Sequence, residues 1–151
     1  MKKTFALLIT LVFSIGGYAQ IEDPVKWGYF AKRTSATEAT ILLKATIQPG
    51  WHIYSLNVKS GGPIKTDITF APSKDFSLVG KTIEPAPLKK FEKDFKMNVT
   101  YFEKEVVFQQ KIKLKSANAT TVKGTIEYEV CNNGKCVLPP EVHFNIPVAK
   151  L

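Results

Sequence analysis

The sequence contains few residues of the kinds that build metal centres or disulfide frameworks. Its 151 residues include two Cys and two His, too few for a four-ligand structural zinc site unless carboxylates complete it. Two Cys also exclude a scaffold held by several bridges. No Gly-rich phosphate loop, Ser/His/Asp arrangement or paired-carboxylate signature is present, so hydrolytic and nucleotide-dependent functions lack support. We therefore expect no metal and no cofactor.

Long apolar runs are absent except near the N-terminus. Lys2 and Lys3 precede an apolar stretch over residues 5–15, and small residues follow at 17–19. This order is typical of a cleaved secretory signal peptide, and the stretch is shorter than the roughly 20 residues of a membrane-spanning helix. We predict a signal peptide at 1–19 and one exported domain at 20–151, with no membrane insertion of the mature chain.

Long blocks of like charge are also missing, although the formal net charge is +8. Residues 1–19 hold two Lys and no acidic residue, so their removal lowers the net charge to +6. The remaining Lys residues are spread along the chain and alternate with acidic residues. This pattern favours a solvated surface with protected sheet edges over a nucleic-acid interface.

Apolar residues recur with period two through most of the mature chain, which predicts β-strands. Turn-forming residues such as Pro49-Gly50, Gly61-Gly62-Pro63 and Asn132-Asn133-Gly134 separate these stretches. Seven or more short strands in one domain of this size predict an all-β, immunoglobulin-like β-sandwich. The expected strands lie at 27–33, 41–47, 51–58, 68–70, 76–79, 100–102, 106–114, 126–130 and 142–148.

The segment 87–95 departs from this pattern. Leu88, Phe91 and Phe95 have the spacing of one helix face, but two Pro precede the segment and it is short for a helix. We expect a loop here, with room for one helical turn.

The two cysteines flank a turn-forming insert, Asn132-Asn133-Gly134-Lys135. A hairpin at this position brings Cys131 and Cys136 within disulfide reach, and an exported pair is expected to oxidise. Loop entropy assigns so small a ring roughly 2 kcal/mol, against about 4.7 kcal/mol for a ring of 100 residues. The spacing alone leaves a redox role and a structural role open. Lys135 beside Cys136 would favour the thiolate if its ammonium group lies near the sulfur.

The cysteine segment, Tyr128 to Glu141 with its Pro139-Pro140-Glu141 ending, resembles the active-site hairpin of the N-terminal domain of DsbD. DsbD is the thiol:disulfide interchange protein of bacterial envelopes. Gly50-Trp51-His52-Ile53-Tyr54 is similar to the family segment that lies beside the cysteine pair, and Asp94-Phe95 resembles the family's cap loop. The resemblance extends over essentially the whole mature chain. Two departures stand out: many members have one more residue between the cysteines, and a Tyr where His52 stands here.

The resemblance implies a periplasmic thiol-disulfide exchange domain of a kind linked to cytochrome c biogenesis. Cys136 would attack a client disulfide and Cys131 would resolve the mixed disulfide. Phe95 would cover the pair, and Asp94 and Tyr54 would tune the thiols or the docking surface. The implied partners are a thioredoxin-like or DsbD-type membrane electron donor, and disulfide isomerase or thioredoxin-like clients. Because the sequence stops at Leu151, the donor is expected to be a separate protein.

Each of these residues also has a structural interpretation. Phe95 could fill the edge of the core, Tyr54 could be a half-buried strand residue, and Asp94 could be a solvated charge. His52 is interpreted as structural rather than as a base, and His143 is expected on an exposed face. The alternative function is a secreted β-sandwich binding or adhesion module with an incidental hairpin disulfide.

Overall fold

The computed structural model describes residues 24–151. The predicted signal peptide, residues 1–19, and the predicted mature N-terminus lie outside these residues. The described part of the chain forms twelve β-strands in three antiparallel sheets. None of these residues belongs to a helix long and apolar enough to cross a membrane.

The first sheet has four strands, β1 (Val25–Arg33), β2 (Glu38–Ile47), β8 (Glu105–Leu114) and β5 (Phe76–Ile83), in that spatial order. Alternate residues of β2 and β8 point inward and are buried, as their period-two pattern predicts. Gln110 is a polar exception at an inward position, 1% exposed. Its side chain bonds Thr82 and the carbonyl of Val79 where the β5 register shifts, so its polar atoms are satisfied.

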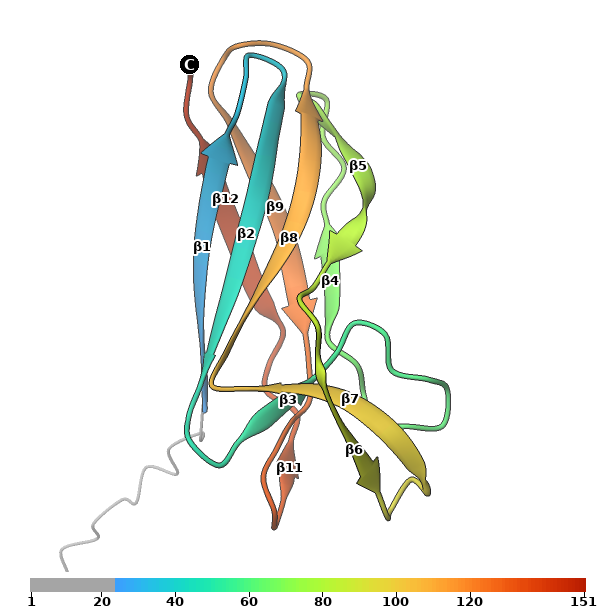
Figure 1. Ribbon diagram of the computed structural model, residues 1–151. Helices are drawn as coiled ribbons and strands as arrows, with labels where there is room; N and C mark the ends of the chain where they lie inside the picture. The colour runs from blue at the N-terminus through green and yellow to red at the C-terminus, as the bar shows by residue number, and fades with distance from the viewer. Residues whose placement is uncertain (1–23) are drawn as a thin grey trace, which may run out of the picture.

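The second sheet has three strands, β12 (Val142–Val148), β9 (Thr120–Glu127) and β4 (Asp67–Phe70), in that order. It forms the other layer of a sandwich with the first sheet (Figure 1). The core between the layers includes Phe108 from the first sheet and Ile126 and Phe144 from the second. The immunoglobulin-like β-sandwich predicted from the sequence is thereby confirmed.

A third sheet, of five strands, lies at one end of the sandwich, at the bottom of Figure 1. Its spatial order is β11 (Cys136–Val137), β10 (Val130–Cys131), β3 (His52–Tyr54), β7 (Met97–Glu103) and β6 (Leu88–Glu92). β7 continues into β8 through Lys104, whose φ is 65°, so one stretch of chain serves two sheets. This third sheet was not predicted from the sequence.

The loop prediction for residues 87–95 is wrong over its first half. Leu88–Glu92 is an edge strand that pairs with β7, and a tight turn over residues 93–96 follows it. Leu88 and Phe91 are exposed and contribute to no buried helix face. The helix-like spacing therefore has no structural counterpart, because backbone pairing with β7 fixes the conformation of this segment.

The guanidinium group of Arg33 holds the C-terminal end of β1 in place. Arg33 donates hydrogen bonds to five backbone carbonyls, and the distances from its nitrogens to these oxygens range from 2.7 to 3.2 Å. The carbonyls belong to Ser35, Ala36, Ser116, Asn118 and Ala149. Arg33 thus ties the β1–β2 turn to the β8–β9 connection and to the chain after β12.

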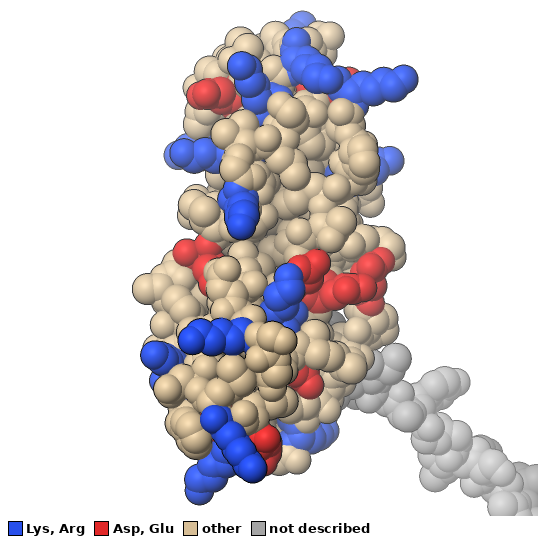
Figure 2. Space-filling view, turned by 90° about the vertical axis from the view of Figure 1, so that its right-hand side faces the viewer, with Lys and Arg blue, Asp and Glu red and all other residues tan. Residues whose placement is uncertain are grey.

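Charged side chains are distributed over the surface. On the face in Figure 2, Lys and Arg occur at both ends and in the middle, with acidic side chains among them. Lys44 pairs with Glu105 at 2.7 Å, and Lys65 pairs with Asp67. This arrangement agrees with the solvated surface expected from the charge pattern.

Candidate functional site

The two cysteines face each other across the β10–β11 hairpin and form a disulfide bond. Asn132 builds the turn between them: its Oδ1 accepts hydrogen bonds from the amides of Gly134 at 2.8 Å and Lys135 at 2.9 Å. Its own amide donates to the carbonyl of Lys135 at 2.9 Å. The predicted hairpin disulfide is therefore present, and the first residue of the insert shapes it.

The two cysteines differ in exposure. Cys131 is 2% exposed and packs in a small cluster with Tyr54 and Val99, whereas Cys136 is exposed. A second protein therefore has access to Cys136 and not to Cys131. Thiol-disulfide exchange needs an incoming thiolate to reach one sulfur directly. Because only Cys136 is exposed, an incoming thiolate would attack Cys136, and Cys131 would react only within the pair.

β3 lies beside the hairpin because His52 and Ile53 pair with β10 on one side, while all three residues of β3 pair with β7 on the other. His52 stands opposite Cys131 in this register. The His52 side chain is 5% exposed, and its Nε2 lies 3.4 Å from the Tyr54 hydroxyl and 3.2 Å from Lys90 Nζ. Burial, together with the nearby charge of Lys90, lowers the pKa of His52 to about 4. His52 is therefore neutral at physiological pH.

Tyr54 lies on the same face of β3, with its ring in edge contact with the His52 ring. Burial raises the pKa of Tyr54 to about 12, and the carboxylates of Glu92, Glu129 and Asp94 act in the same direction. The hydroxyl is thus a hydrogen-bond donor throughout the physiological range. Its backbone is also fixed, since the Tyr54 carbonyl accepts a hydrogen bond from Thr66 at 2.6 Å.

The chain after β3 is anchored by one carboxylate from the β5–β6 connection. Glu84 accepts hydrogen bonds from Ser55 Oγ at 2.5 Å, the Leu56 amide at 2.9 Å and Asn57 Nδ2 at 2.9 Å. This links β3 to the segment that leads into β6, so the two walls of the site are held in a fixed relation.

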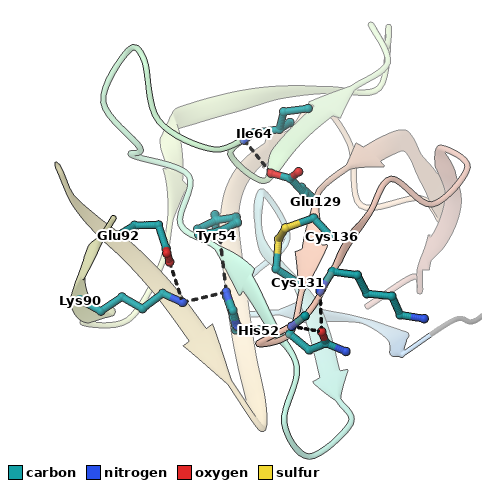
Figure 3. The surroundings of a disulfide bond; sticks show 11 residues. His52, Tyr54, Ile64, Lys90, Glu92, Glu129, Cys131 and Cys136 are labelled. Carbon is teal, nitrogen blue, oxygen red and sulfur yellow. Dashed lines mark hydrogen bonds and ion pairs between the residues drawn. A yellow bond between two sulfur atoms is a disulfide. The ribbon is translucent and has the colours of Figure 1, made fainter. Parts of the chain in front are cut away.

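β6 supplies Lys90 and Glu92, which point toward the hairpin (Figure 3). Lys90 Nζ lies 3.0 Å from Glu92, 3.2 Å from His52 and 5.1 Å from the centre of the Tyr101 ring. Sequence reasoning missed both residues because it expected a loop here. A strand with period two would have placed them together on the face opposite Phe91.

All seven residues singled out from the sequence line one cleft, with a volume of about 410 Å³. Phe95 and Asp94 come from the turn after β6, and Phe95 is 37% exposed. Lys90, Glu92 and the turn residues between the cysteines complete the lining. The seven are His52, Tyr54, Asp94, Phe95, Cys131, Lys135 and Cys136.

Lys135 lies on the cleft wall, and its Nζ is 5.6 Å from the centre of the Trp51 ring. A cation over an indole face is a favourable contact. The ammonium group of Lys135 therefore lies against Trp51 in this structure.

Glu129 was not singled out from the sequence and lies next to the disulfide (Figure 3). A carboxylate oxygen of Glu129 and the sulfurs of Cys131 and Cys136 lie within 4.8 Å of one another. The sequence spacing could have identified Glu129, because Glu129 and Cys131 are two residues apart and such residues point to the same side of an extended chain. This donor set could bind a thiophilic metal only after reduction, since thiolates are the ligands that such metals take.

Comparisons with known proteins agree with this geometry. Residues 24–147 match the family described as thiol:disulfide interchange protein DsbD, N-terminal. The N-terminal periplasmic domain of ScsB from Proteus mirabilis shares 24% identity, with a TM-score of 0.60. That alignment covers 82% of this chain and 46% of the ScsB domain, so the chain spans less than half of this relative.

A second solved structure shows the same fold. It is a chain from the complex between the DsbD N-terminal and PilB N-terminal domains of Neisseria meningitidis, with 15% identity and a TM-score of 0.51. The alignment covers 79% of this chain and 80% of that chain. No curated protein sequence matches the chain.

Proposed function

Because the chain belongs to the family of DsbD N-terminal domains, we propose that it passes reducing equivalents between proteins through Cys131 and Cys136. The donor is a thioredoxin-like or DsbD-type membrane protein, and the recipients are disulfide-bonded envelope proteins. The observation that carries this proposal is the disulfide between a buried and an exposed cysteine, at the wall of an open cleft.

In the proposed reaction, the Cys136 thiolate of the reduced domain attacks one sulfur of a client disulfide. A Cys136–client bond forms, the client disulfide breaks, and its second sulfur leaves as a thiolate that takes up a proton. Cys131 then attacks Cys136 Sγ, which forms the Cys131–Cys136 disulfide and releases the second client thiol. The client is reduced by two electrons and the domain is oxidised by two. A donor dithiol reverses the same steps on the domain.

The turn after β6 is proposed to act as the cap of this site. Phe95 and Asp94 line the cleft from the turn that joins the edge strand β6 to β7. Residues 93–96 of this turn are exposed, so a partner can displace the turn without breaking the β6–β7 pairing, and Phe95 would shield the disulfide until then. His52, Tyr54 and Lys135 form the fixed floor and wall.

The proposed compartment is the periplasm. The predicted signal peptide supports export, and the ScsB domain named above is periplasmic. An oxidising compartment is also where a cysteine pair of this kind persists as a disulfide. The DsbD N-terminal domain of Neisseria meningitidis forms a complex with a PilB domain, which supports docking of a protein partner at a domain of this fold.

The test is capture of the mixed disulfide. In the Cys131→Ser variant, Cys136 can attack a client but no thiol resolves the product, so disulfide-linked complexes with envelope proteins should accumulate. The Cys136→Ser variant is the matched control, because its remaining thiol is buried. If Cys131→Ser traps no more protein than Cys136→Ser, the proposed exchange reaction is wrong.

A further inference from the structure

Burial makes deprotonation of a thiol unfavourable, and Cys131 is the buried member of the cysteine pair. The residue is 2% exposed and packs against Tyr54 and Val99. Burial in an apolar setting disfavours the thiolate, which is the form that attacks a disulfide. Release of a client by Cys131 therefore requires a nearby group that takes the proton.

Glu129 meets the geometric requirement. Its carboxylate lies within 4.8 Å of both sulfurs, a separation that one water molecule or a small side-chain rotation closes. Glu129 Oε2 accepts a hydrogen bond from the Ile64 amide at 3.0 Å, which fixes the carboxylate beside the hairpin (Figure 3). A carboxylate has several acceptor lone pairs, so the Glu129 carboxylate can accept a proton or a further hydrogen bond while it keeps the bond from the Ile64 amide. The residue is half-buried, so its proton can pass on to solvent.

The other groups around the pair are less suited to this task. His52 faces Cys131 from β3, but its Nε2 already contacts Lys90 and the Tyr54 hydroxyl, and its pKa is lowered to about 4. Tyr54 holds its own proton, since its pKa is raised to about 12. Glu92 on β6 is paired with Lys90 at 3.0 Å.

Two more charged groups line the cleft. Asp94 lies on the exposed turn after β6, and the Lys135 ammonium lies over the Trp51 ring. Asp94 is on the side of the cleft that a partner must displace, so its position depends on the cap. Glu129 lies two residues before Cys131, and the hydrogen bond from the Ile64 amide holds its carboxylate beside the hairpin.

We propose that Glu129 is the proton acceptor and donor for Cys131 in the exchange reaction. The inference rests on the proposed function and adds a residue to it. When Cys131 attacks Cys136 Sγ, the Cys131 S–H proton moves to the Glu129 carboxylate, the Cys131–Cys136 bond forms, and the client leaves as a thiolate. In the reverse direction a donor thiolate attacks Cys136, the disulfide breaks, and Glu129 returns the proton to the Cys131 thiolate.

The test separates the two chemical steps with dithiodipyridine, an uncharged disulfide that releases an absorbing thione at each step. Cys136 of the reduced full-length mature protein releases the first thione, and Cys131 releases the second when it closes the intramolecular disulfide. Glu129→Gln keeps an oxygen that can accept the Ile64 hydrogen bond and removes the proton acceptor. Glu127→Gln, an exposed change of the same charge two residues away, is the matched control.

Glu129→Gln should slow the second release by roughly 10–100-fold near neutral pH, relative to wild type and Glu127→Gln. Above about pH 9, where thiols ionise unaided, its second rate should approach that of wild type. An unchanged second rate, or a slowing that is equal at every pH, overturns the role of Glu129 and leaves the exchange reaction standing. A wild-type protein that releases no second thione overturns the exchange reaction itself, and this inference with it.

Discussion

Acidification from about pH 7.5 to about pH 4.5 should destabilise the protein through His52 by about 2–3 kcal/mol. The pKa of His52 is about 4 in the folded state, against an ordinary value of 6.5 that applies when the chain is unfolded. The unfolded state therefore takes up the proton first as the pH falls, and protonation favours unfolding. The contribution of His52 to stability is fully present above about pH 6.5 and is lost as the pH falls toward 4.

The magnitude follows from the two pKa values. Their separation corresponds to about 3 kcal/mol when the pH lies below both, at roughly 1.4 kcal/mol per pKa unit. At about pH 4.5 the folded-state histidine is still mostly neutral, and the loss has reached about 2–3 kcal/mol. The physical source is the burial of the ring, with a smaller part from Lys90.

The assay is urea denaturation of the oxidised protein at several pH values, with His52→Phe as the comparison. Phe keeps an aromatic ring between Tyr54 and Tyr101 but does not titrate, and Lys90 retains Glu92 as its partner. Other groups titrate alike in both proteins, so the difference between the two pH profiles isolates His52. Parallel profiles for wild type and His52→Phe would refute the reasoning, as would an NMR titration of His52 near its ordinary value.

Three further predictions concern stability and are checked by thermal and urea unfolding. Gly124→Ala should cost about 3 kcal/mol or more, because a Cβ there would collide with the Phe144 ring and a neighbouring backbone carbonyl, whereas Gly28→Ala has open space and should change stability by less than about 1 kcal/mol. Arg33→Ala should lower the free energy of unfolding by about 2 kcal/mol, because five backbone carbonyls lose their hydrogen-bond donor. A change below about 0.5 kcal/mol would show that these hydrogen bonds do not hold the connections together. Lys96→Gly should stabilise the protein by about 0.5–1 kcal/mol, because Lys96 has a φ of 52°; destabilisation would show that its side chain contributes more than the backbone strain costs.

Local patterns in the sequence predicted the sandwich and the hairpin correctly. Period two in residues 41–47 and 106–114 reports which side chains point inward, and β2 and β8 bury those residues. The turn residues between Cys131 and Cys136 likewise act locally, since Asn132 bonds amides two and three positions ahead. Such features depend on neighbours in the chain and can be recognised without knowledge of distant pairing.

The rest of the site depends on pairing between distant segments. β3 has three residues, and only its register with β10 places His52 opposite Cys131. β6 carries a helix-like spacing by chance, and pairing with β7 makes it a strand and directs Lys90 and Glu92 into the cleft. Periodicity within one segment holds no information on either pairing, so only the family resemblance indicated that residues 50–54 lie beside the cysteines, and the contacts of Lys90 and Glu92 were not predicted.

The reduction potential of the Cys131–Cys136 disulfide tests the central claim most directly. It can be measured by equilibrating the protein with thiol buffers of known potential and counting free thiols by mass after alkylation. A pair that carries electrons between proteins should have a potential between about −270 and −120 mV, the range of thioredoxin-like exchange proteins. A potential below about −300 mV, which is typical of structural disulfides, would contradict the account.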